Sequence, residues 1–216
     1  MMNHVRDATL GSFLLAAAAC GSSPIEPSET TTDPPAAACG ASQHQPNYVA
    51  ELNMMNSVRY TSWPIRAYIE EPELARRGYS DTRRAFIVQA IMRGLSAWAR
   101  QTGGKVGQVV ATSDFNQATL TVVFRNQQEN QLGAVTHETS GGAIRVSRMV
   151  LNVDYIETRA GADRLWESTP AHEMGHALGI VGHPSSPQSL MAPYVGEFRE
   201  PQRIDTNSIL VKYGCP

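Results

Sequence analysis

The chain has 216 residues, of which 42% are hydrophobic, and its 18 lysines and arginines nearly balance its 20 aspartates and glutamates. The net charge of −2 is spread without a block of like charge, which argues against a nucleic-acid partner. About 175 residues follow the polar N-terminal region, enough for one hydrophobic core but not comfortably for two. We therefore expect a single globular domain, and we expect it to be a monomer.

The N-terminal region predicts export. Residues 1–19 contain one arginine and then an apolar run, which is typical of a secretory signal peptide and too short to span a membrane. The segment Ala17-Ala18-Ala19-Cys20 resembles a bacterial lipobox, in which Cys20 would become the lipidated first residue. Residues 20–39, rich in serine, threonine and proline, would form a flexible tether. The hypothesis is an exported lipoprotein of the bacterial cell envelope that meets the membrane only through its lipid anchor. A plain secreted form and a cytoplasmic protein are the alternatives.

The first part of the domain combines a strand with a long helix. Residues 63–69 alternate apolar and polar positions, which predicts the first strand. Ser80 or Asp81 can cap the helix that follows, and Gly103-Gly104 would end it. Apolar residues recur every three or four positions and mark its buried face, at Ile87, Ile91, Leu95 and Trp98.

The next part is rich in strands and leads to a second helix. Strands are predicted over 106–111, 118–124 and 133–138, followed by an extended segment over 144–155. Thr169 and Pro170 indicate the N-cap and the first residue of the second helix. This order of elements predicts one mixed α/β domain.

The second helix carries the most informative motif. The segment from His172 to His183 fits H-E-x-x-H-x-x-G-x-x-H. On a helix, His172 and His176 lie one turn apart on one face, so both imidazoles can reach the same ion. Gly179 can adopt a positive φ and turn the chain, which brings His183 back as a third ligand. Glu173, next to the first ligand, is placed to take a proton from a metal-activated water.

Two later segments resemble a known family. The segment from Ser189 to Tyr194 resembles the Met-turn of the metzincin zinc peptidases, and Met191 would pack beneath the three ligands without coordinating. The stretch from Ile204 to Gly214 resembles the last helix of the matrixins, and Asp205 matches the aspartate that braces the region beneath their active site. The chain therefore resembles a matrixin-like metzincin over roughly residues 58–214.

The resemblance implies a fold and an activity. The fold would be an α/β (α+β) metzincin-type zincin fold. It would have a twisted mixed five-stranded sheet, two long helices, and a small C-terminal subdomain with the Met-turn and a final helix. Residues 40–216 would form the catalytic domain, with residues 133–136 as the antiparallel edge strand to which an extended peptide can add. The activity would be that of a zinc metalloendopeptidase acting on protein or peptide substrates with one catalytic Zn²⁺. Calcium is compatible with the family, but no residue pattern here supports it.

The three cysteines fit an exported protein. Lipidation of Cys20 would leave Cys39 and Cys215, at the two ends of the globular part. Two leftover cysteines in an exported chain favour a disulfide, and two free thiols are the alternative.

Two other functions compete with the peptidase hypothesis. One is a tethered surface binding protein with a non-catalytic zinc site, although structural sites usually have four protein ligands and no fourth candidate follows the motif. The other is a metal hydrolase that acts on a non-protein polymer, which the motif by itself does not exclude.

Overall fold

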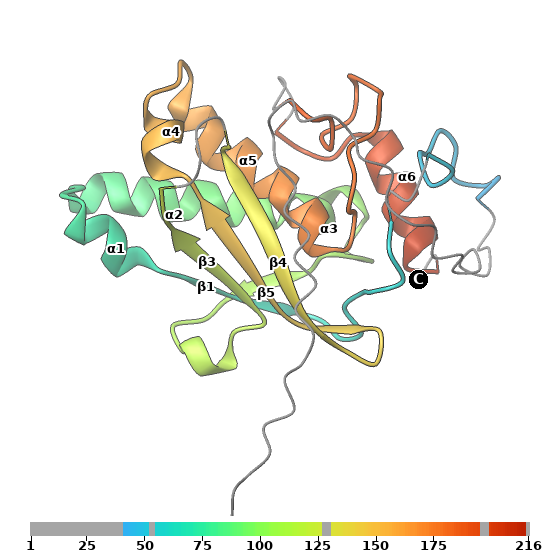
Figure 1. Ribbon diagram of the computed structural model, residues 1–216, viewed down its shortest axis with the longest axis horizontal. Helices are drawn as coiled ribbons and strands as arrows, with labels where there is room; N and C mark the ends of the chain where they lie inside the picture. The colour runs from blue at the N-terminus through green and yellow to red at the C-terminus, as the bar shows by residue number, and fades with distance from the viewer. Residues whose placement is uncertain (1–40, 52–54, 127–130, 195–198, 215–216) are drawn as a thin grey trace, which may run out of the picture.

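The computed structural model describes residues 41–51, 55–126, 131–194 and 199–214. It has a mixed α/β architecture with a five-stranded, mostly parallel sheet and several helices (Figure 1). The predicted signal peptide and tether lie outside the described residues, as do Cys20, Cys39 and Cys215. Within the described ranges, no helix has both the length and the apolar character needed to cross a membrane.

The sheet is mixed and five-stranded, as the sequence predicts. Its strands are β1 (Ile65–Ile69), β2 (Val109–Ala111), β3 (Leu120–Phe124), β4 (Gly133–Ser140) and β5 (Ala143–Leu151). Their order is β2-β1-β3-β5-β4, and every neighbouring pair is parallel except β4 with β5. The antiparallel strand β4 therefore lies at the edge of the sheet, joined to β5 by the turn at Gly141-Gly142.

The helices differ greatly in length. They are α1 (Glu71–Arg76), α2 (Asp81–Leu95), α3 (Ala97–Gln101), α4 (Val153–Glu157), α5 (Ala162–Ala177) and α6 (Arg203–Lys212), with a short 3₁₀ helix at Phe115–Gln117. The two long helices, α2 and α5, lie on the same face of the sheet, and α6 lies beyond the C-terminal end of α5 (Figure 1). The core fills the space between them, and its largest fully buried side chains include Trp98 and Trp166.

Helix α2 confirms its predicted cap and its predicted buried face. The Ser80 side chain accepts a hydrogen bond from the Arg83 backbone N–H at 3.2 Å. The four residues expected to face the core, Ile87, Ile91, Leu95 and Trp98, are all fully buried. The predicted single helix is divided at Ser96, after which α3 carries Trp98 and ends at Gln101, just before the two glycines.

The predicted start of the motif-bearing helix is wrong. Helix α5 begins at Ala162 after the N-cap Gly161, and Pro170 lies inside it. A Thr-Pro pair is a local start signal, but burial of Leu165 and Trp166 against the core extends the helix toward its N-terminus. Proline within a helix removes one backbone hydrogen bond, and here this loss is tolerated.

Several other boundaries differ from the predictions. The extended segment predicted over 144–155 ends at Leu151, because the Asn152 side chain accepts from the Tyr155 N–H and begins helix α4. The strand predicted over 106–111 is shorter, since Gly107 has a φ of +79° and pairing starts only at Val109. Helix α1 was not predicted from the sequence.

Candidate metal centre

Three histidines converge at the C-terminal end of α5. The Nε2 atom of His172 lies 3.2 Å from the Nε2 atoms of both His176 and His183. Metal–nitrogen bonds of about 2.0–2.1 Å at tetrahedral angles place two nitrogens about 3.3 Å apart. The three histidines therefore lie close enough to hold one metal ion, as the motif predicts. Among the described residues, this group contains no fourth ligand.

The turn that brings in His183 depends on Gly179. This residue has a φ of +93°, in the left-handed region, and its N–H donates to the carbonyl of His176 at 2.8 Å. A Cβ atom there would lie 2.6 Å from the Val58 carbonyl oxygen and 2.8 Å from Cε of Lys212. Only glycine meets both the conformational and the spatial requirement, which confirms the turn predicted from the motif.

Backbone carbonyls fix the orientation of two of the rings. Nδ1 of His172 lies 2.8 Å from the carbonyl oxygen of Leu190, and Nδ1 of His176 lies 2.6 Å from that of Ile180. Because a carbonyl oxygen only accepts, each Nδ1 carries the proton, and in the neutral rings both Nε2 atoms present lone pairs. Such a second hydrogen bond is how metal-binding histidines are usually oriented.

Burial keeps these imidazoles neutral. It lowers the pKa of His172 to about 4, with a further contribution from His183. Burial also lowers the pKa of His176 well below its usual range, with further contributions from the neighbouring rings, and lowers that of His183. Two unprotonated nitrogens 3.2 Å apart cannot bond to each other, whereas a cation between them would be bound by both lone pairs. The donor set therefore fits a metal such as zinc.

Glu173 is a buried acid without a hydrogen-bond partner among the described residues. Its side chain is fully buried, and neither carboxylate oxygen accepts a hydrogen bond from the part of the chain that the structure describes. Burial raises the pKa of this carboxyl from its usual value to about 8. A lone buried carboxyl is costly to keep, and Glu173 directly follows one of the three converging histidines, which makes it a candidate functional residue.

Met191 packs against the helix that carries two of the histidines. It is fully buried, and a Cβ added to Gly175 would come within 2.2 Å of its sulfur atom. Gly175 directly precedes His176, and its lack of a side chain leaves room for the thioether beside the helix backbone. Gly175 is therefore a packing requirement that the motif did not reveal, and the position of Met191 beneath the three histidines stays a prediction.

Asp205 supports the segment that carries Met191. Its buried carboxylate accepts hydrogen bonds from the Ser189 hydroxyl, from the Leu190 N–H at 2.8 Å and from the Gln202 N–H at 2.8 Å. Leu190 in turn accepts the proton of His172 Nδ1. Hydrogen bonds therefore link the Asp205 carboxylate through Leu190 to His172, which supports the bracing role that the resemblance implies.

His137 is a residue of the site that sequence reasoning missed. It lies on β4, where Nε2 is 3.2 Å from the carbonyl oxygen of His176 and Nδ1 is 2.9 Å from the hydroxyl oxygen of Ser147. Tyr60 donates to the same hydroxyl oxygen at 2.7 Å. No spacing in the chain signals this network, because its members come from separate segments and meet only in the fold.

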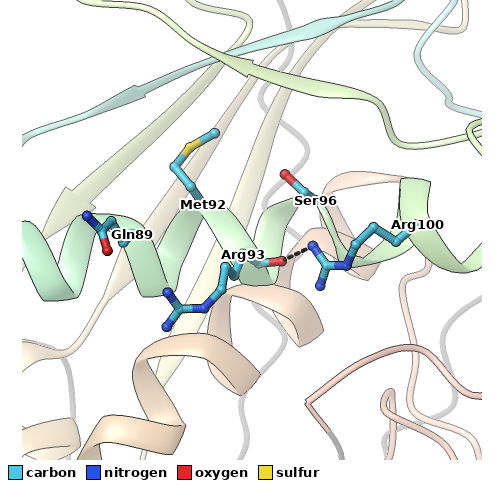
Figure 2. Close-up of a pocket in the computed structure, with 5 residues that line it drawn as sticks. All are labelled: Gln89, Met92, Arg93, Ser96 and Arg100. Atoms are coloured by element: carbon cyan, nitrogen blue, oxygen red, sulfur yellow. Dashed lines mark hydrogen bonds between the residues drawn. The ribbon is translucent and has the colours of Figure 1, made fainter.

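Other acidic residues and other hollows lie apart from this centre. Asp114 caps the 3₁₀ helix, and Asp154 pairs with Arg77 on the surface. A hollow of about 330 Å³ lies along α2 and α3. Figure 2 shows the residues that line it, among them Arg100, which donates to the Arg93 carbonyl at 2.9 Å. None of the metal-centre residues lines it, so the candidate site rests on donor chemistry and not on the size of a cavity.

Comparison with models of known protein families finds no family that matches this chain, and a search of curated proteins finds no matching relative.

Proposed function

We propose that this protein is a zinc-dependent endopeptidase of the metzincin type, similar to the matrixins. The observation that carries the proposal is one arrangement: three neutral imidazoles whose Nε2 atoms converge, beside a fully buried carboxyl group without a partner among the described residues. Three protein ligands leave one position of a tetrahedral ion open, as in catalytic zinc sites and unlike most structural ones.

Different residues would bind the metal ion and transfer the proton during hydrolysis. His172, His176 and His183 hold the ion, and Glu173 is the general base. When bound, zinc would polarise a water molecule and the substrate carbonyl, and its charge would favour the carboxylate form of Glu173. Glu173 accepts a proton from the attacking water and then donates it to the leaving amine. The full burial of Glu173 would keep bulk water away from this proton transfer.

Strand β4 offers a place for an extended substrate. It is the edge strand of the sheet, and its first residue, Gly133, lies against the side chain of Glu173. A peptide that adds to a free strand edge gains backbone hydrogen bonds, and here it would pass the general base. This placement supports protein or peptide substrates and favours a peptidase over a hydrolase of another polymer.

The arrangement of elements also supports the metzincin type. Four features follow one another in the order that the resemblance implies. They are an edge strand antiparallel to its neighbour, a helix with two of the histidines that ends in a glycine turn, a buried methionine and a final helix. Export, lipidation at Cys20 and a bridge between Cys39 and Cys215 belong to the same proposal and await mass spectrometry of the mature protein.

The test is hydrolysis of casein by the purified protein, with and without a zinc chelator. We expect chelation to abolish cleavage and added zinc to restore it. Glu173→Ala should keep its zinc but lose at least about 10²-fold in rate, the scale of general-base catalysis.

A matched control lies on the same helix. Glu167 is a glutamate that pairs with Arg93, so Glu167→Ala should cleave at nearly the wild-type rate. Cleavage by Glu173→Ala as fast as by wild type would contradict the role of Glu173. Zinc binding without any cleavage would favour a binding protein with a non-catalytic zinc site.

A further inference from the structure

The position of the Glu173 carboxylate is set by packing alone. Neither of its oxygens is held by a hydrogen bond from the described residues. A carboxylate that acts as a base must nevertheless lie within about 0.5 Å of its productive position. Some contact must therefore hold it in place, and the atoms that surround it are the candidates.

Strand β4 lies against the Glu173 side chain at Gly133. A Cβ atom on Gly133 would lie 2.8 Å from Cγ, 2.9 Å from Cδ and 2.9 Å from Oε1 of Glu173. Real Cβ atoms essentially never come closer than 3.0 Å to a neighbour, so any side chain there would have to displace the carboxylate or the strand. The space occupied by the base exists because residue 133 has no side chain.

Backbone conformation does not explain this glycine. Gly133 pairs in register with Leu151 of β5, and its φ lies outside the left-handed region, unlike that of Gly179. An alanine could adopt the same backbone conformation. The requirement at position 133 is therefore one of space, and the group that fills this space is the side chain of Glu173.

We propose that Gly133 is a positioning residue. Because it has no side chain, the Glu173 carboxylate can lie against β4, and this contact sets its distance from the three imidazoles. The inference rests on the proposed function, because it gives Glu173 the role of general base. It adds that the edge strand restrains the base directly. Even a single methyl group at position 133 would move the carboxylate.

A double-mutant cycle on thermal stability tests the contact between Gly133 and Glu173 without any assay of activity. Wild type, Gly133→Ala, Glu173→Ala and the double variant are compared by thermal unfolding in their zinc-loaded form. Overpacking by one methyl group should lower the Tm of Gly133→Ala by about 3–10 °C. In the Glu173→Ala background most of this loss should disappear, because the clashing atoms are gone.

A buried alanine three strands away serves as the control. Ala67 lies in β1, and Ala67→Val should lower the Tm by the same amount whether or not Glu173 is present. Equal loss for Gly133→Ala in both backgrounds would overturn the proposal. Should Gly133→Ala fail to fold, folding of the double variant supports the proposal, and its failure to fold overturns it.

Kinetics test the consequence for catalysis. Gly133→Ala should lower kcat by about 10- to 100-fold with little change in KM or in bound zinc, since a displacement of the base of about 1 Å has this scale of effect. A kcat within twofold of wild type would overturn the positioning role. Failure of the proposed function itself is separate: it shows as a wild type that does not cleave, or as an active Glu173→Ala, while the stability cycle still decides the contact.

Discussion

Asp205 illustrates how one buried residue supports the whole ligand set. Its carboxylate accepts from one hydroxyl and two backbone N–H groups, and one of those belongs to Leu190, whose carbonyl orients His172. Burial raises the pKa of Asp205, and these hydrogen bonds act against that rise. The residue therefore stabilises the loop through hydrogen bonds that only a paired set of acceptor oxygens can make.

Asp205→Asn should destabilise the protein and weaken zinc binding. Oδ2 of Asp205 accepts from both backbone N–H groups, and Oδ1 accepts from the Ser189 hydroxyl. With the amide oxygen of asparagine in the place of Oδ2, the amide nitrogen replaces Oδ1, and the buried hydroxyl of Ser189 loses its acceptor. An unpaired buried donor costs about 1–3 kcal/mol, so unfolding by urea should show a loss of this size. Titration with zinc should show lower affinity, because Leu190 and therefore His172 are less well held.

The control for this substitution is Asp154→Asn. Asp154 pairs with Arg77 at the surface, where such pairs contribute about 0–1 kcal/mol. It should unfold almost like wild type and bind zinc equally well. If Asp205→Asn behaved in the same way, the path from Asp205 to the ligand would have no energetic importance.

At the scale of elements, the sequence predicted what depends on local periodicity. The buried face of α2, the cap at Ser80 and the turn at Gly179 follow from residues within a few positions of one another. The start of α5 could not be predicted in this way. Its first turns are stabilised by burial of Leu165 and Trp166, and the Thr-Pro signal downstream was a local preference that packing overrode.

The same distinction applies to the site. The three ligands and Glu173 lie within twelve consecutive residues, so their spacing alone predicted that they would meet. Gly133 and His137 come from strand β4, which the resemblance placed as the edge strand, but no spacing in the chain indicates that these two residues contact Glu173 and His176. Contacts between distant segments require the fold, and the sequence pattern therefore predicted the ligands better than their supports.

Helix α6 ends in a buried lysine whose charge is costly. Nζ of Lys212 donates to the backbone carbonyl of Asn56 at 2.5 Å, and the stem of its side chain packs against Gly179. Burial, with a smaller contribution from Arg59, lowers the pKa of Lys212 from 10.5 to about 8. The folded protein therefore favours the neutral amine more strongly than the unfolded chain does.

This lysine should make the protein more stable as the pH rises from about 8 to about 10.5. Over that range the unfolded chain still binds the proton that the folded protein has released, so the free energy of unfolding increases by about 3 kcal/mol. Below pH 8 the lysine is charged in both states and its full penalty is present. Lys212→Met should lack this gain when urea unfolding is measured at several pH values.

Comparison between variants isolates the lysine from other titrating groups. Burial raises the pKa values of Tyr60 and Tyr213, and both tyrosines are present in wild type and variant alike. Lys105 is exposed, so Lys105→Met should keep the wild-type dependence on pH. Identical pH profiles for Lys212→Met and wild type would mean that the ammonium group is solvated in the folded protein.

At the scale of the whole molecule, the ligand centre joins segments that are distant in the chain. Helix α5 supplies two of the candidate ligands and the loop after Gly179 supplies the third, while carbonyls of Ile180 and Leu190 orient two of the rings. Strand β4 contributes Gly133 and His137. An ion at this centre would therefore hold helix α5 and the loop after Gly179 together.

Removal of the metal should consequently lower the stability of the whole domain. Without a cation, the Nε2 lone pairs of His172 and His176 face each other at 3.2 Å. An ion that is present at about 1,000 times its dissociation constant adds about 4 kcal/mol, which corresponds to about 10 °C in the Tm of a protein of this size. Chelation should lower the Tm by that amount, and zinc should restore it, whereas Mg²⁺ should not, because it prefers oxygen ligands. Glu173→Ala should keep the zinc-dependent shift and His183→Ala should lose most of it, so a Tm that does not respond to chelation would show that the three imidazoles hold no ion.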